Sequence, residues 1–262
     1  MAGGTIYDLA HPLSVGMPQV PQLAPFVLSQ ANQHGNRPLP GGYTLCSEIM
    51  CSATHVGTHM DGLVHGARNG WLWDGTEVAR LQRGFGGLAE RGMDTVPPII
   101  RRGILLDVAG ARGVEVLGER DVISPADLAE TVRWEGVAIG PGDVVLLRTG
   151  WARNWSQPER YADLERGNPG PGVDAARWLA DRGIHATGSD TIAYEAQPAP
   201  MPVHGLLLAE RGIYIIENLN LEALAADRVY VFAVVIAPLK IVGASGAPVR
   251  PLALPLKVLQ HL

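Results

Sequence analysis

The stretch from Thr54 to His65 reads THVGTHMDGLVH and holds the densest group of metal-ligand side chains in the chain. Three histidines and one aspartate fall within it: His55, His59, His65 and Asp61. Imidazole and carboxylate together suit a first-row divalent ion such as zinc or manganese better than calcium or magnesium, which prefer oxygen ligands. The alternative, a group of surface polar residues on a Gly-rich loop, explains so dense a cluster beside an apolar strand poorly. The stretch therefore predicts a metal site.

The spacing within this stretch lets three side chains converge on one ion. His55 and His59 are four residues apart, so they share one face of a helix or meet across a turn at Gly57. His59 and Asp61 are two apart, so in an extended segment they point to the same side. We expect His65, four residues beyond Asp61, to stand beside the metal as an acid or base.

The same residues resemble the signature of the metal-dependent cyclase family, HxGTHxDxPxH, which includes bacterial kynurenine formamidases and isatin hydrolases. The matching positions are His55, Gly57, Thr58, His59, Asp61 and His65. Leu63 stands where many members have proline. Because proline ligates nothing, this difference bears on the subfamily and on formamidase activity more than on metal chemistry.

A second group of candidate ligands lies in the last quarter of the chain. Glu217 sits within IYIIENL, which predicts a buried strand, and a carboxylate there is costly unless it is paired or binds a cation. His204 begins an apolar run that predicts a helix ending at Gly212. The alternative is a structural Glu217 that accepts hydrogen bonds from backbone amides at the strand end. The family resemblance implies a second metal site made by His204, Glu217 and a bridging Asp61.

Length and composition fit a single α/β domain over residues 1–262. The chain is 47% hydrophobic and 18% charged, with a net charge of -5, and is long enough to bury a sizeable core. No basic stripe or acidic tail indicates nucleic acid or an anionic membrane as a partner. The N-terminal segment lacks a signal-peptide pattern and no run approaches a membrane span, so we expect a cytoplasmic protein.

Turn signals and apolar runs predict alternating strands and helices. A capping pattern at Ser124, Pro125 and Asp127 opens one helix. A second helix is predicted over residues 173–182, ending before Gly183, and strands over residues 5–9, 43–52, 103–109, 144–149 and 184–189. The resemblance implies a swivelling β/β/α architecture with a mixed sheet and flanking helices. It also implies homodimers or homotetramers whose neighbouring subunit can complete the pocket.

Residues 11–42 are rich in proline and have few periodic apolar positions, which predicts an irregular arm that covers a pocket or a neighbouring subunit. The only cysteines, Cys46 and Cys51, would face opposite sides of the following strand, which disfavours a disulfide. We expect them to be core residues in preference to a further metal site. Trp71 and Trp73 point to one side, either packing on the sheet, which we favour, or lining an aromatic substrate pocket.

The predicted chemistry is hydrolysis of an amide, cyclic amide or lactone in a small-molecule substrate, with aromatic compounds among the candidates. One or two Zn²⁺ or Mn²⁺ ions would lower the pKa of water toward neutrality. His65 would take the proton of the attacking water and return it to the leaving nitrogen or oxygen. Thr58 is expected to orient a metal ligand. Asp190 and Glu217 are the next candidates if the base lies elsewhere.

Two other functions remain open at this point. A cyclising enzyme or lyase could use the same metal to polarise a carbonyl while His65 moves a proton from carbon. A metal-dependent binding or sensor protein would keep the fold without turnover, although binding alone needs no proton shuttle such as His65. Glycine-rich phosphate-binding motifs and the GxSxG elbow are absent from the sequence, so dinucleotide, kinase and serine-hydrolase chemistry lose their support.

Overall fold

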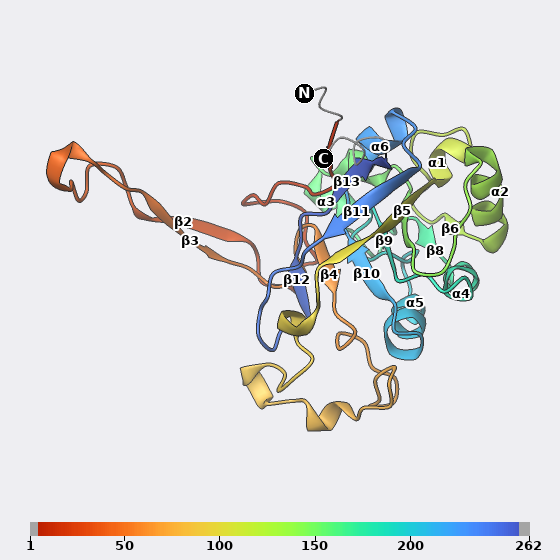
Figure 1. Ribbon diagram of the computed structural model, residues 1–262, viewed down its shortest axis with the longest axis horizontal. Coiled ribbons are helices and arrows are strands. Elements are labelled where there is room, and N and C mark those ends of the chain that lie inside the picture. Colours follow the sequence, from red (N-terminus) through yellow and green to blue (C-terminus); the bar gives the residue numbers. More distant parts are fainter. Residues whose placement is uncertain (1–4, 257–262) are drawn as a thin grey trace.

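The computed structural model describes residues 5–256, and its centre is a curled mixed sheet (Figure 1). Within these residues the sheet has nine strands. In spatial order they are β1 (Tyr7–Asp8), β13 (Leu252–Pro255), β11 (Val231–Ile236), β5 (Ile99–Asp107), β7 (Val144–Arg148), β9 (Ala186–Ser189), β10 (Tyr214–Glu217), β4 (His59–Asp61) and β12 (Gly246–Pro248). The predicted mixed α/β fold is confirmed.

The middle of the sheet is parallel and its two sides are antiparallel. Strands β5, β7, β9 and β10 run parallel, whereas β11, β13 and β1 on one side and β4 and β12 on the other pair antiparallel. Parallel strands are normally covered on both faces, which explains why VVLLR in β7 is buried throughout.

Helices cover one face of these central strands. They are α2 (Pro125–Glu135), α4 (Val173–Ala180), α5 (Pro202–His204) and the π-helix Gly205–Glu210 that continues α5. Alternate side chains of β5 pack on the two faces: Ile104 and Leu106 pack with Leu128 of α2, whereas Leu105 packs with Phe232. The sheet is therefore buried on both sides and provides a rigid support for the site.

The local signals in the sequence account for most of these helices. Ser124 and Asp127 form the predicted capping box of α2, and Gly136 ends the helix in a left-handed conformation. Helix α4 ends at Ala180, one turn before left-handed Gly183. The helix predicted to open at His204 starts earlier, at Pro202, and becomes a π-helix.

The remaining elements are short. They are α1 (Val108–Ala111), α3 (Pro158–Tyr161), α6 (Glu222–Ala226), the pair β6 (Val122–Ile123) and β8 (Gly170–Pro171), and 3₁₀ turns at Pro40–Gly42, Val78–Arg80, Gly84–Gly86, Met93–Thr95 and Trp151–Asn154. Among the described residues, none of the helices is both long and apolar enough to cross a membrane.

A long two-stranded hairpin projects from this body (Figure 1). Its strands are β2 (Val27–Asn32) and β3 (Ser47–Cys51). The prediction of an irregular segment over residues 11–42 is therefore wrong for β2, because strand pairing with β3 overrides the scarcity of periodic apolar positions. Cys46 and Cys51 are free thiols, but both are exposed and not in the core. The strand that carries Cys51 pairs with β2 alone and packs on no sheet face of the described chain.

Candidate metal centre

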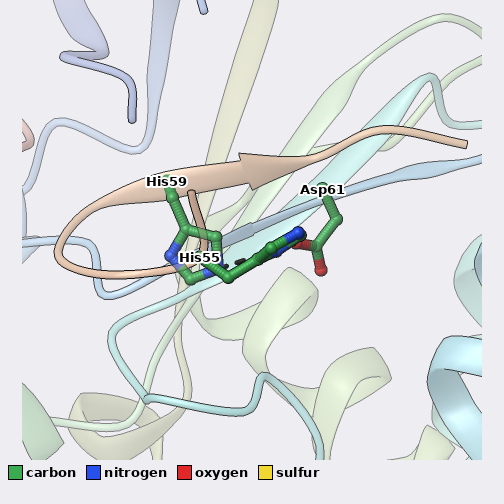
Figure 2. Close-up of side chains that lie close together, drawn as sticks. All are labelled: His55, His59 and Asp61. Atoms are coloured by element: carbon green, nitrogen blue, oxygen red, sulfur yellow. Dashed lines mark hydrogen bonds and ion pairs between the residues drawn. The ribbon is translucent and has the colours of Figure 1, made fainter. Parts of the chain in front are cut away.

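Strand β4, next to the edge strand β12, holds two of the predicted ligands as buried side chains. It lies between β10 and β12, with His59 opposite Glu217 and Asp61 opposite Ile215. Because His59 and Asp61 are two residues apart, both side chains leave β4 on the same side, and His55 reaches them from the preceding loop (Figure 2). Asp61 is 1% exposed, so its charge needs a partner.

A turn, and not a helix, brings His55 back to this strand. Gly57 has a φ of +67°, a conformation that costs glycine little. A Cβ atom at this position would lie 2.5 Å from Leu13 Cδ2. The turn also lets the Gly57 carbonyl accept a hydrogen bond from His59 Nδ1 at 2.8 Å. That bond leaves His59 Nε2 directed at the carboxylates.

Two groups of ligand-type side chains meet at Asp61. Among the described residues, the first group is His55, His59 and Asp61, and the second is Asp61, His204 and Glu217. Within each group the candidate ligand atoms lie within 4.8 Å of one another. The structure thus brings together all five residues that the sequence suggested as ligands, from segments more than 140 residues apart, and Asp61 belongs to both groups.

Most distances among these five residues, within a group and between the two groups, are those expected of atoms that share an ion. His59 Nε2 lies 3.6 Å from Asp61 Oδ1 and 3.4 Å from Glu217 Oε2. His204 Nε2 lies 3.6 Å from Asp61 Oδ2 and 3.2 Å from Glu217 Oε1. A tetrahedral ion with bonds of roughly 2.0–2.2 Å separates its ligands by about 3.3–3.6 Å. The exception is His55, whose Nδ1 lies at hydrogen-bond distance, 2.7 Å, from Asp61 Oδ1.

The charges of the centre also call for a cation. Oε1 of Glu217 is buried and has no hydrogen-bond partner within residues 5–256. Burial alone would raise the pKa of Glu217, but the imidazoles of His204 and His59 beside its carboxylate outweigh burial and lower that pKa. Burial likewise opposes protonation of His59, yet Glu217 and Asp61 raise its pKa to about 9. Protons on imidazole thus neutralise the two carboxylates here, and a divalent ion would replace those protons. The residues present fit a metal.

Glu195 orients His204 from outside the ligand groups, and the sequence interpretation missed it. His204 Nδ1 donates to Glu195 Oε1 at 2.6 Å, which leaves Nε2 facing Asp61 and Glu217. The backbone amides of Val203 and His204 donate to the same carboxylate. The sequence gives no signal for this pairing beyond the acidic residue itself, because Glu195 and His204 are nine residues apart and most of the chain between them is irregular.

We expect Glu195→Gln to weaken metal binding by about 10- to 100-fold, because the amide removes the negative charge that orients and polarises His204. Metal titration of the metal-free protein would measure this loss. Glu165→Gln, at an exposed position, is the matched control and should bind metal as the unmodified protein does. Equal affinities in the two variants would contradict an orienting role for Glu195.

His65 lies beside the ligands and belongs to neither ligand group of the described residues. Its ring stacks on His55 with centroids 4.0 Å apart, and its centroid is 6.5 Å from that of His204. Burial lowers the pKa of His65 below its ordinary value of 6.5, so at neutral pH the ring is a neutral base. The structure thus places His65 in one cavity with the candidate ligands, and its role as an acid or base stays a prediction.

Two other expectations about polar residues are wrong. Thr58 orients no ligand: its Oγ1 donates to the Asn218 carbonyl at 2.6 Å and accepts from the His11 amide at 2.9 Å. It therefore ties β4 to the end of β10. Asp190 is fully buried and accepts hydrogen bonds from Thr149 and Gly150. It holds a turn and does not line the metal cavity, so it is no alternative base.

The ligand groups open into a cavity of about 450 Å³. Its wall is mostly apolar, formed by Val20, Leu23, Leu164, Ile192, Met201 and Leu208, and Gln22 adds an amide. Among the described residues, no lysine or arginine lines it. Trp71 and Trp73 are 50% and 47% exposed and lie outside this lining. The predicted packing of the two tryptophans on the sheet is thus incomplete, and neither tryptophan forms an aromatic wall of this cavity.

Residues 7–196 match the Cyclase family model, described as "Putative cyclase". The chain belongs to this family. The match covers His55, His59, Asp61 and His65 and stops before His204 and Glu217, so the second ligand group rests on the structure.

Among the relatives of this cyclase-family chain is the isatin hydrolase of Roseibium aggregatum. The two are 31% identical over 148 residues, which cover 53% of this chain and 55% of the relative. The matched part thus spans about half the length of that protein. Among solved structures, one described as a novel cyclase has 27% identity and a TM-score of 0.88, covering 97% of this chain and 89% of its own. Isatin hydrolase A from Ralstonia solanacearum has 27% identity and a TM-score of 0.71, with coverage of 95% and 91%.

Proposed function

We propose that this protein is a metal-dependent hydrolase that cleaves an amide, cyclic amide or ester bond of a small neutral substrate. The observation that carries the proposal is the pair of ligand groups that share Asp61, with His65 in the same cavity. The similarity to isatin hydrolases supports it. The proposed location is the cytoplasm, which rests on the sequence pattern alone.

The proposed ligands are His55, His59 and Asp61 for one ion, and Asp61, His204 and Glu217 for a second. Nitrogen and carboxylate donors at these distances suit Zn²⁺ or Mn²⁺. When bound, such an ion supplies Lewis acidity, which polarises a carbonyl and lowers the pKa of water. The site residues supply the geometry: β4 fixes His59 and Asp61, and Glu195 and the Gly57 carbonyl hold the imidazoles in the required tautomer.

His65 is the proposed proton-transfer residue. Its neutral ring takes a proton from the attacking water and returns it to the leaving nitrogen or oxygen. Stacking on His55 holds the ring plane beside the ligands. Because burial favours the neutral ring and lowers its pKa, the base form is present at neutral pH.

The cavity wall favours a neutral and largely apolar substrate. Apolar side chains such as Leu164, Ile192 and Leu208 surround the ligands, and no lysine or arginine of the described residues is part of the cavity lining. A volume of about 450 Å³ accommodates a bicyclic aromatic ring. Isatin, the compound for which the relatives are named, is therefore the first substrate to test.

Hydrolysis in ¹⁸O-labelled water tests the proposed reaction class. We expect ring opening of isatin or a related cyclic amide to place one ¹⁸O atom in the product carboxylate, measured by mass spectrometry. The control is the product itself, incubated with enzyme in labelled water, which corrects for exchange. Turnover without incorporated label would instead support a lyase or a cyclising enzyme.

A further inference from the structure

Asn218 follows the candidate ligand Glu217 directly and has a left-handed backbone conformation, with a φ of 56°. Its own amide donates to the Thr191 carbonyl at 3.0 Å, and its carbonyl accepts from Thr58 Oγ1 at 2.6 Å. Among residues with a side chain, asparagine is one of the few that adopt this conformation readily, and glycine adopts it more easily still. The backbone conformation therefore does not by itself account for an amide side chain here, where Asn218 is only 2% exposed.

The side-chain amide of Asn218 shares a hydrogen-bond acceptor with His59. Asn218 Nδ2 donates to the Gly57 carbonyl at 2.8 Å, and His59 Nδ1 donates to the same carbonyl at 2.8 Å. A carbonyl oxygen has two lone pairs and can accept both bonds. The direction of the Gly57 carbonyl is thus set by two donors at once, one of them the imidazole of a candidate ligand.

The neighbours of Asn218 determine which way its amide faces. The Gly57 carbonyl can only accept, so the amide nitrogen and not the amide oxygen lies against it. On the other side, the Tyr161 hydroxyl lies 3.0 Å from Asn218 Oδ1 and 3.0 Å from the Asp190 carbonyl, and its proton serves these two acceptors. Burial raises the pKa of Tyr161 well above its ordinary value, so the hydroxyl keeps that proton. Both ends of the buried amide are therefore paired.

We propose that Asn218 is a positioning residue that sets the orientation of His59 through the Gly57 carbonyl. Gly57 has no side chain to restrain its own peptide plane, so the bond from Asn218 is what keeps the carbonyl opposite His59 Nδ1. A fixed carbonyl holds the imidazole proton on Nδ1 and leaves Nε2 facing the carboxylates of Asp61 and Glu217. The inference rests on the proposed role of these residues as metal ligands.

Titration of the metal-free protein with Zn²⁺ tests this role. Asn218→Gly keeps the left-handed backbone and removes the amide, and we expect it to lower the affinity for Zn²⁺ by about 10- to 100-fold. The circular dichroism spectrum of the metal-free variant should match that of the wild type. Asn69→Gly is the matched control, because Asn69 is also left-handed, with a φ of 52°, but is exposed and belongs to neither ligand group of the described residues. It should bind Zn²⁺ as the wild type does.

Repeating the substitution without His59 separates positioning from a general loss of structure. In His59→Ala the remaining ion would be held by Asp61, His204 and Glu217. In that background Asn218→Gly should change the affinity for Zn²⁺ by less than about twofold, because the imidazole on which Asn218 acts is absent. A merely structural role would weaken Zn²⁺ binding equally with and without His59.

Tyr161→Phe is the second variant, and it decides the matter if Asn218→Gly does not fold. It removes the hydroxyl beside Asn218 Oδ1 and keeps Asn218 itself. We expect a smaller loss of Zn²⁺ affinity than in Asn218→Gly, and again none in the His59→Ala background. Zn²⁺ binding is measured without substrate, so failure of this inference and failure of the proposed hydrolysis are separate results. Unchanged affinity in the folded variant, or equal losses with and without His59, would overturn the proposal.

Discussion

Replacement of His65 by alanine should lower turnover by about 10²- to 10⁴-fold and leave the metal bound. The expected loss is large because the cavity holds no other neutral base among the described residues: His55, His59 and His204 are ligand candidates, and Asp190 holds a buried turn. Metal retention follows from the position of His65, which lies outside both ligand groups. Steady-state kinetics together with elemental analysis of the same preparation measure both outcomes.

The pH dependence of the turnover rate is an independent test of the role of His65. Burial lowers the pKa of His65 below 6.5, and a bound cation nearby would lower it further. The neutral base therefore persists as pH falls to 6.5, and the acidic limb of the rate profile should lie below that value. This limb should disappear in His65→Ala and in His65→Asn.

A histidine outside the cavity is the control for His65. His185, which packs near Tyr214, can be changed to alanine and should leave the acidic limb in place. Loss of metal in His65→Ala would show instead that His65 is a ligand. Full activity with metal retained would show that the base lies elsewhere.

Asp61→Asn should remove both metal equivalents and reduce hydrolysis to background. Asp61 belongs to both ligand groups, and its two oxygens face different histidines: Oδ1 lies near His59 and Oδ2 near His204. Burial would raise the pKa of Asp61, yet contacts with His204 and His55 hold it well below the usual value. Its negative charge is therefore part of the site, and asparagine of the same shape removes it.

Comparing the metal content of Asp61→Asn with that of Glu217→Gln separates loss of the carboxylate shared by both sites from loss of a ligand to one site. Glu217 belongs to one group only, so Glu217→Gln should lower the metal content by about one equivalent and leave the other. Asp174→Asn, at a side chain that is 80% exposed, controls for the change of charge. Retention of two equivalents in Asp61→Asn would contradict a shared carboxylate.

The first ligand group was predictable because its geometry is local. His55, Gly57, His59 and Asp61 lie within seven residues, and strand alternation plus one glycine turn suffices to aim them at a point. Glu217 could be inferred from the cost of a carboxylate in an apolar strand. The capping box of α2 could likewise be predicted from the sequence, since all its hydrogen bonds lie within four residues.

The features that sequence interpretation missed depend on contacts between distant segments. Glu195 accepts a hydrogen bond from His204 across mostly irregular chain, and Thr58 donates one to the carbonyl of Asn218, 160 residues away. The arm over residues 11–42 was predicted, but the strand β2 within it was not, because β2 is stabilised by pairing with β3 and not by a periodic apolar pattern. Cys51, on β3, is exposed against the usual burial of free thiols, because that strand pairs with β2 alone.

The metal content and metal dependence of the wild-type protein test the central claim most directly. Elemental analysis of purified protein should find up to two equivalents of zinc or manganese per chain. Removing them with a chelator should abolish hydrolysis, and adding back Zn²⁺ or Mn²⁺ should restore it. A preparation that contains no divalent metal and hydrolyses its substrate at full rate in the presence of the chelator would contradict the account.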